Sequence, residues 1–189
     1  MKRLLCLAFI LVCAFVSAES QKYDISPPLS SLTFDVSAQV HQVHGTSNAF
    51  SGTITGDPAD ITTASITVSL DPSTFDTQDK ARDQVMREKS LETDKYPAVA
   101  FVSKAVEATS KQLEPDKPLS ATIKGTLKLH GMDKEMSVPV TITLHENQIT
   151  AEGDMALKLD DWNIFRPRVV LFKLQNDIKI HFKVGGIKR

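Results

Sequence analysis

The sequence predicts a mostly β protein of one domain, in which about eight antiparallel strands are joined by short connections and accompanied by one helix. Over many short stretches, apolar and polar residues alternate with a period of two, the pattern of strands with one buried face. Turn-forming residues separate these stretches, and one interval departs from the period. The chain of 189 residues suits a single domain of ordinary size behind an apolar leader.

The alternation is clear near the start of the domain, where Leu32, Phe34 and Val36 are separated by Thr33 and Asp35. Side chains two positions apart on a strand share a face, so the apolar set is expected to point into the core. The same pattern predicts strands over residues 32–40, 49–56, 66–70, 99–102, 123–130, 136–144, 149–159 and 174–184.

Turn sequences fall between these strands, at residues 56–58, 114–118, 130–133 and 146–147. Short connections favour antiparallel neighbours. The strands could form a sandwich or a closed barrel, and composition does not distinguish the two. A barrel of eight strands is just wide enough to be filled by its own side chains or to hold one small ligand. Whether the interior is hollow is therefore the central functional question.

The interval that breaks the alternation, residues 77–93, predicts the single helix. It contains no Gly or Pro, and Asp76 or Thr77 is a plausible N-cap. Ala81 and Val85 share one helical face, and Asp83 lies four residues before Arg87 in the favourable orientation for an ion pair. Pro97 prevents the helix from continuing.

Residues 1–18 have the pattern of a secretory signal peptide. Lys2 and Arg3 precede an apolar run over residues 4–16, and Ser17 and Ala18 are small residues at a plausible cleavage site. The run is shorter than the roughly 20 apolar residues that span a bilayer. We therefore expect cleavage, a domain over residues 19–189, and a periplasmic or secreted location.

Composition and motifs exclude several classes of function for the domain. Both cysteines, Cys6 and Cys13, lie in the leader, so the domain has no disulfide or thiolate site. The formal net charge is −1, which provides no basic surface for nucleic acid. Ser51 lacks the glycine two positions before it that a nucleophile elbow requires, and no glycine-rich phosphate loop is present. We expect neither an enzyme nor a cofactor.

Two histidines lie close together in the sequence, His41 and His44, and imidazole is a common metal ligand. On a strand, however, positions three apart point to opposite faces. The pair therefore predicts no metal site without a loop there and further ligands.

An ordered set of five motifs carries a family resemblance. The motifs are DPSTFDT at 71–77, ARD at 81–83, KYPAVAF at 95–101, GTLKLHG at 125–131 and KLDDWNI at 158–164. In this order they resemble the YceI-like polyisoprenoid-binding family, over about residues 23–184. The resemblance implies an extended lipocalin-like antiparallel β-barrel with a long apolar tunnel, bacterial export, an isoprenoid or fatty-acyl ligand and no established catalysis. It is compatible with a homodimer and with transient membrane contact.

The chain departs from the family pattern at Lys128, Lys158 and Asn163, and residues 165–168 look like an insertion. These differences bear on the mouth of the barrel more than on the fold.

The inward positions of the predicted strands supply the expected cavity wall. We expect the ligand to contact Leu32, Phe34, Val36, Val68, Leu70, Phe101, Leu127 and Leu129. At the barrel mouth, guanidinium groups could bind a polar or pyrophosphate headgroup, and aromatic side chains could gate the entrance. The candidates are Arg82, Arg87, Arg166 and Arg168 for the headgroup, and Trp162, Phe165 and Tyr96 for the gate.

Each of these positions has a simpler interpretation. The wall residues could fill a solid core. The arginines could be solvated or paired locally, and Arg82 and Asp83 could pin the helix to the barrel. The aromatic residues could be ordinary core residues. The leading hypothesis is thus an exported carrier of a long-chain lipid. The alternatives are a filled barrel that docks a partner or acts in a stress response, and a hydrolase or isomerase acting on a bound lipid.

Overall fold

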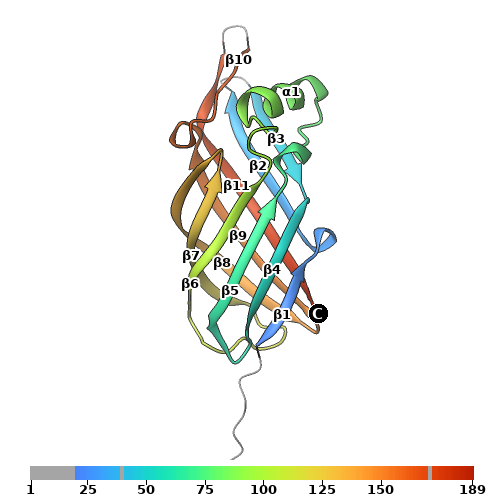
Figure 1. Ribbon diagram of the computed structural model, residues 1–189, viewed down its shortest axis with the longest axis vertical. Helices are drawn as coiled ribbons and strands as arrows, with labels where there is room; N and C mark the ends of the chain where they lie inside the picture. The colour runs from blue at the N-terminus through green and yellow to red at the C-terminus, as the bar shows by residue number, and fades with distance from the viewer. Residues whose placement is uncertain (1–19, 39–40, 170–171) are drawn as a thin grey trace, which may run out of the picture.

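The structure is a computed structural model that describes residues 20–38, 41–169 and 172–189, and it shows an elongated β-barrel with one helical segment at its upper end (Figure 1). The predicted signal peptide lies outside the described residues. In the described part of the chain, eight antiparallel strands form the ring, which closes through pairing of the first with the last. In ring order these are β1 (Gln21–Ile25), β4 (Phe50–Asp57), β5 (Asp60–Leu70), β6 (Val99–Ala108), β7 (Leu119–Leu129), β8 (Met132–His145), β9 (Gln148–Lys158) and β11 (Phe172–Lys188).

Two further strands extend one side of the barrel towards its upper end. β2 (Ser31–Ala38) follows β1 after the short 3-10 helix η1 (Pro27–Leu29), and both pair with the same edge of β11. β3 (His41–Ser47) pairs with β2 and leads into β4. The two-residue strand β10 (Arg168–Val169) pairs with the start of β11.

The barrel and the alternation in its predicted strands are confirmed, whereas β1, β3 and the two-residue β10 were not predicted. β1 contributes only two inward residues, Tyr23 and Ile25, too few to establish a period. β3 reads HQVHGTS, so its polar residues conceal the pattern. β8 also begins earlier than expected, within the predicted turn at residues 130–133.

The helix is shorter than predicted and begins later. α1 spans Lys80–Val85 and continues into the π-helical turn η3 (Met86–Ser90). Its N-cap is Asp79, which accepts hydrogen bonds from the amides of Ala81 and Arg82, both at 3.1 Å. The expected start at Asp76 or Thr77 is wrong because Gln78 has a left-handed backbone (φ 63°) that interrupts helical geometry. Two more 3-10 turns, η2 (Pro72–Thr74) and η4 (Leu159–Trp162), border the same end.

Asp83 bonds to Thr77 and not, as expected, to Arg87. Asp83 is buried, and its Oδ1 accepts hydrogen bonds from the Thr77 amide at 3.0 Å and the Thr77 hydroxyl at 2.6 Å. Arg82 donates from Nε to the same hydroxyl at 2.7 Å and from Nη2 to the Thr77 carbonyl at 2.6 Å. Two neighbouring charged residues of α1 therefore hold Thr77, in the segment that leads into the helix; these bonds do not reach a barrel strand. Within the described residues, no helix is long and apolar enough to span a membrane.

The ladder between β8 and β9 leaves a seam in the barrel wall. The ladder between β8 and β9 runs from His145 and Gln148 up to Thr141 and Glu152 and then stops, although both strands continue. The next outward position on β8 is Pro139, which has no amide hydrogen to donate to a neighbouring strand. Its carbonyl faces β9, where a methyl group placed on Gly153 would lie 2.5 Å from the oxygen.

We expect replacement of Asp83 by alanine to reduce the free energy of unfolding by about 1–3 kcal/mol, because the buried amide and hydroxyl of Thr77 would lose their acceptor. Urea denaturation measures the change. The matched control is Gln84→Ala, since the Gln84 side chain is exposed and bonds only along the helix to Glu88. Equal stability of the two variants would contradict a structural role for Asp83.

Candidate functional site

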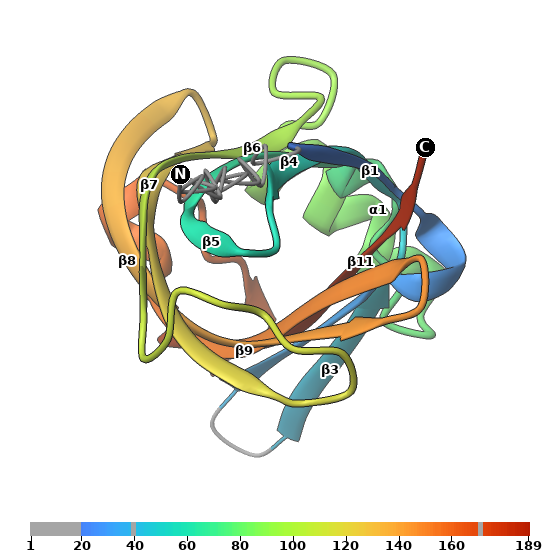
Figure 2. The same ribbon diagram turned by 90° about the horizontal axis from the view of Figure 1, so that it is seen from below.

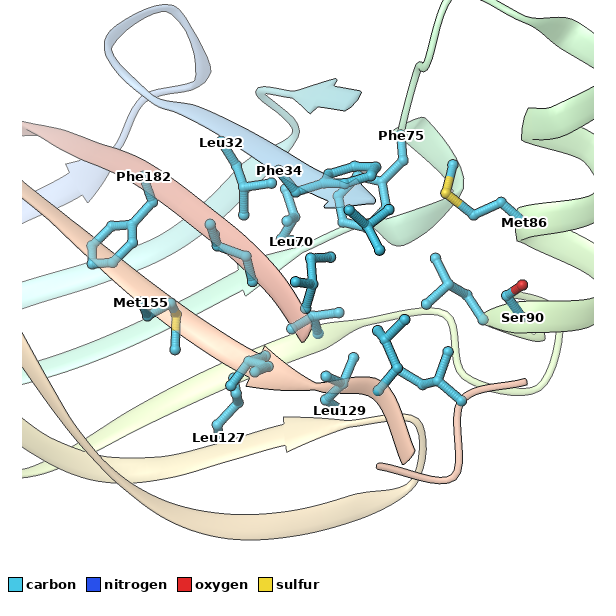
Figure 3. A pocket seen from close by; sticks show the side chains of 18 of the residues that line it. Leu32, Phe34, Leu70, Phe75, Met86, Ser90, Leu127, Leu129, Met155 and Phe182 are labelled. Carbon is cyan, nitrogen blue, oxygen red and sulfur yellow. The ribbon is translucent and has the colours of Figure 1, made fainter. Parts of the chain in front are cut away.

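The upper half of the barrel encloses an apolar cavity with a volume of about 690 Å³, which is within the range typical of small-molecule sites. Strands from all sides of the barrel contribute to it, and α1 and η3 cover its upper end (Figure 3). In Figure 3, Met86 and Ser90 approach from the helical segment, while Phe182 and Met155 lie deeper, on the strands.

All eight residues predicted from the alternation to form the wall line this cavity. The structure brings together Leu32, Phe34, Val36, Val68, Leu70, Phe101, Leu127 and Leu129. The upper part of the barrel is therefore hollow, in contrast to the filled-core interpretation.

The cavity exists because three phenylalanine rings lie against glycines in the barrel wall. Phe34 is paired with Gly45 across β2 and β3, and Phe182 with Gly153 across β11 and β9. A methyl group at Gly45 would overlap the Phe34 ring, and one at Gly153 would lie 3.0 Å from Phe182 Cζ. On β7, Gly125 lies diagonally across from Phe101 of β6, and a methyl group placed on it would lie 2.6 Å from Phe101 Cζ. The rings thus occupy the space of missing side chains and leave the middle of the barrel open.

The lower half of the barrel is filled, so the cavity has a closed end. Ile54, Ile123 and Val140 line the cavity and also belong to a buried cluster that continues below it. The residues of this cluster that do not reach the cavity are Tyr23, Ile61, Ala64, Val106, Leu113, Leu119, Ala121, Ile142, Leu144 and Ile149. Burial raises the pKa of the Tyr23 phenol, whose hydroxyl donates to Gln21 Oε1 at 2.6 Å. The interior therefore accepts a ligand from the upper end only to a limited depth.

Among the described residues, the polar side chains that line the cavity lie at its upper end. They are Thr77, Asp79, Arg82 and Ser90, all from the segment that contains α1 and η3. Besides its two bonds to Thr77, the Arg82 guanidinium lies 3.9 Å from the Asp79 carboxylate through Nη1. The site therefore combines a long apolar wall with one polar end, which is the polarity pattern of an amphiphile.

Of the residues predicted for the entrance, some line the cavity and others do not. Arg82 and Phe165 line the cavity, whereas Arg87 does not. Arg166 does not line it either: it pairs with Asp160, at 2.7 Å from Nε to Oδ1, and Nη1 donates to the Leu174 carbonyl at 2.9 Å. These local bonds hold the Arg166 guanidinium between η4 and the start of β11, away from the cavity lining. The side chain of Arg168 lies outside the described residues.

Trp162 is a core residue rather than a gate. Its side chain is only 2% exposed, it packs with Leu159 and Ile164, and it does not reach the cavity. The Trp162 carbonyl accepts a hydrogen bond from His130 Nδ1 at 2.9 Å, which fixes η4 against the β7–β8 turn. Tyr96 packs on the same histidine, with ring centroids 4.5 Å apart, and also lies away from the cavity. Neither aromatic side chain is therefore among the described residues that line the cavity.

Several wall residues were not singled out from the sequence. Ile178, Ile180 and Phe182 were assigned to a strand by their alternation, and that signal could have placed them in the wall. Phe75 had no such signal, because it follows η2 and reaches the cavity by packing on Phe34 at a centroid distance of 5.3 Å.

The described histidines have local partners. His44 contacts Asp35 and His181 contacts Asp154, both at 3.0 Å, and His145 contacts Asp116 at 2.5 Å. The carboxylate of Asp116 raises the pKa of His145. Among the residues that the structure describes, no group of three or more potential ligands is arranged to hold a metal ion. The side chain of His41 lies outside them.

We expect Gly45→Ala to displace the Phe34 ring into the cavity, because the added methyl group takes its place on the wall. Gly45 has no left-handed backbone, so the effect comes from crowding, at a cost of about 1–3 kcal/mol in stability. Titration with a fluorescent long-chain fatty acid should show weaker binding. The double variant Gly45→Ala/Phe34→Leu, with a smaller side chain facing the methyl group, should recover part of both losses. If the single variant binds the probe as tightly as the original chain, the packing explanation fails.

Comparison with known proteins agrees with this architecture. The YceI-like domain model matches residues 23–185. A UPF0312 protein of Pseudomonas savastanoi is 32% identical over 143 residues, which cover 72% of this chain and 71% of the relative. Protein YceI of Shigella flexneri is 30% identical over 161 residues, covering 78% and 75%.

Solved structures show the same fold. BcnA of Burkholderia cenocepacia superposes with a TM-score of 0.71 at 22% identity, over 86% of this chain and 99% of that one. A polyisoprenoid binding domain from Saccharophagus degradans gives a TM-score of 0.72 at 16% identity, over 88% and 98%. The match over most of the chain shows that this protein belongs to the YceI-like domain family.

Proposed function

We propose that this protein is an exported carrier that holds one long apolar chain, a polyisoprenoid or an acyl chain, in its barrel for transport, storage or sequestration. The observation that carries the proposal is the cavity, whose wall is apolar except at the upper end. The polyisoprenoid binding domain among the structural neighbours supports the choice of ligand. The apolar leader at residues 1–18 supports export to the periplasm or beyond.

Burial of the chain supplies the affinity. Each buried methylene contributes roughly 0.8 kcal/mol, so about ten would contribute about 8 kcal/mol. Association costs roughly 4–15 kcal/mol, which a short chain cannot offset. Affinity should therefore increase with chain length until the closed end is reached.

The depth of the cavity sets that limit. Lining residues on β7 run from Ile123 to Leu129, a span of about 20 Å along a strand. With the usual barrel tilt this corresponds to about 15 Å along the axis. The part of a longer chain that exceeds this depth would lie under α1 or outside the barrel.

The headgroup of the ligand would lie beside Arg82 and Asp79, next to Thr77 and Ser90. Arg82 already donates to Thr77, and Asp79 balances its charge. These side chains therefore suit a headgroup that accepts one or two hydrogen bonds, such as a carboxylate or a carbonyl group, better than a doubly charged diphosphate.

Native mass spectrometry of the protein purified from a bacterial host tests the proposal directly. We expect a bound lipid of defined stoichiometry, and organic extraction should release it chemically unaltered. Protein that is purified without bound lipid and also fails to bind added prenyl and acyl chains would refute the proposal. A lipid that is converted during incubation would instead support the enzyme alternative.

Ala151→Leu should shorten the longest chain that binds well, because Ala151 lines the cavity near its closed end. A series of fatty acids of increasing length, measured by displacement of a fluorescent probe, gives the length dependence. Ala156→Leu, on the exposed outer face of the same strand, is the matched control and should leave the series unchanged. If both variants show the same limiting chain length, the end of the cavity near Ala151 does not set that limit.

Arg82→Gln should weaken binding of a fatty acid severalfold while affecting the fatty alcohol of the same length less, since a charge-assisted hydrogen bond is lost only from the carboxylate. Arg87→Gln controls for the general loss of a positive charge on the helical segment, because Arg87 does not line the cavity. Equal effects on acid and alcohol would place the headgroup elsewhere.

A further inference from the structure

Two large apolar side chains are exposed at the mouth of the cavity. Val85 on α1 is 40% exposed and Phe165, after η4, is 56% exposed, yet both line the cavity. Ala81, one helical turn before Val85, lines the mouth as well and is also exposed. We call these three residues the mouth rim. The rim joins the apolar interior to the molecular surface at the same end of the cavity as the polar residues Thr77, Asp79, Arg82 and Ser90.

The rim is a local feature of one end of the molecule. In Figure 1, α1 and the segment that leads into β10 lie at the upper end, opposite the C-terminus. Figure 2 shows the barrel from the other end. Among the described residues, the other exposed large apolar side chains are Val102, on β6, and Ile187, near the lower end of β11. Neither lines the cavity, so exposure coincides with the cavity mouth only at the rim.

The proposed ligand is a long apolar chain, and its chemistry indicates which partner surface the mouth rim contacts. The cost of passing a long apolar chain through water rises with each exposed methylene, so the chain moves to and from a bilayer at least cost along an apolar surface. An aromatic and an aliphatic side chain at the surface can enter the boundary between headgroups and acyl chains. Lys80 and Lys89, both exposed on the same helical segment, can remain among the headgroups.

We infer that the mouth rim docks on the surface of a lipid bilayer, with Val85 and Phe165 inserted, so that the chain moves between membrane and cavity without crossing water. This inference rests on the proposed carrier function for its purpose. Docking itself, however, is a property of the protein surface and can be measured without any cargo.

The test is flotation of the lipid-free protein with phosphatidylcholine vesicles, at low and high salt. We expect binding that survives high salt, because apolar insertion is not screened. Val85→Ser/Phe165→Ser should weaken binding by about tenfold or more, because the inserted apolar side chains are lost. The matched control Val102→Ser/Ile187→Ser removes exposed apolar side chains away from the mouth and should bind vesicles as the original chain does.

A second variant separates insertion from misfolding. Phe165→Trp should retain binding, and its additional tryptophan emission should shift to the blue when vesicles are added. An unchanged emission would overturn the inference, as would equal binding by the two serine double variants. Binding that requires anionic phosphatidylglycerol and disappears in salt would also overturn it, because the basic side chains would then carry the contact.

Transfer of a fluorescent long-chain fatty acid from vesicles to the protein gives an independent measure. Docking predicts a transfer rate constant that rises with the concentration of the acceptor protein, whereas passage through water is limited by desorption from the vesicle and predicts a rate constant that does not. Failure of the carrier proposal has a different signature, since the protein would then bind vesicles but take up no probe.

Discussion

The packing of phenylalanine against glycine in the barrel wall is the constraint on which the rest of the site depends. A barrel of eight strands has a narrow interior, and three large rings directed towards its axis would fill much of it. Phe34, Phe101 and Phe182 instead cover Gly45, Gly125 and Gly153, where no side chain competes for space. The wall gains apolar packing from rings that would otherwise occupy the lumen, and the upper barrel remains hollow.

The two ends of the barrel then acquire different properties. Below the cavity, a cluster that includes Tyr23, Leu113 and Ile142 closes the interior with ordinary close packing. Above it, the strands are covered by α1 and η3, which bring the polar residues of the site. That cover depends on Thr77, which Asp83 and Arg82 hold from two sides. An apolar interior with a single polar end follows from this asymmetry.

The same asymmetry explains why exposed apolar residues gather at one end. A cover over an apolar cavity must present apolar side chains inwards, and a helix of six residues cannot bury all of them. Val85 and Phe165 thus belong to both the cavity and the surface. Their partial exposure leaves apolar surface in contact with water at the cavity mouth.

The sequence by itself determined which side chains of the predicted strands face inwards, because the alternation of a strand fixes the direction of every residue relative to its neighbours. Leu32, Phe34, Val36 and the other five predicted wall residues follow from that rule, and the ordered motifs identify the family. Alternation does not reveal how rings pack across strands, since Gly45 and Phe34 meet only through the register of a hairpin.

Tertiary structure alone decided that the inward residues surround a space, that its lower end is closed, and that Trp162 lies in the core. It also turned Asp83 towards Thr77 rather than Arg87 and ended the β8–β9 ladder at Thr141, next to Pro139. Each of these outcomes depends on contacts between segments far apart in the chain or on competition between partners for one donor. Local pattern carries no information about either.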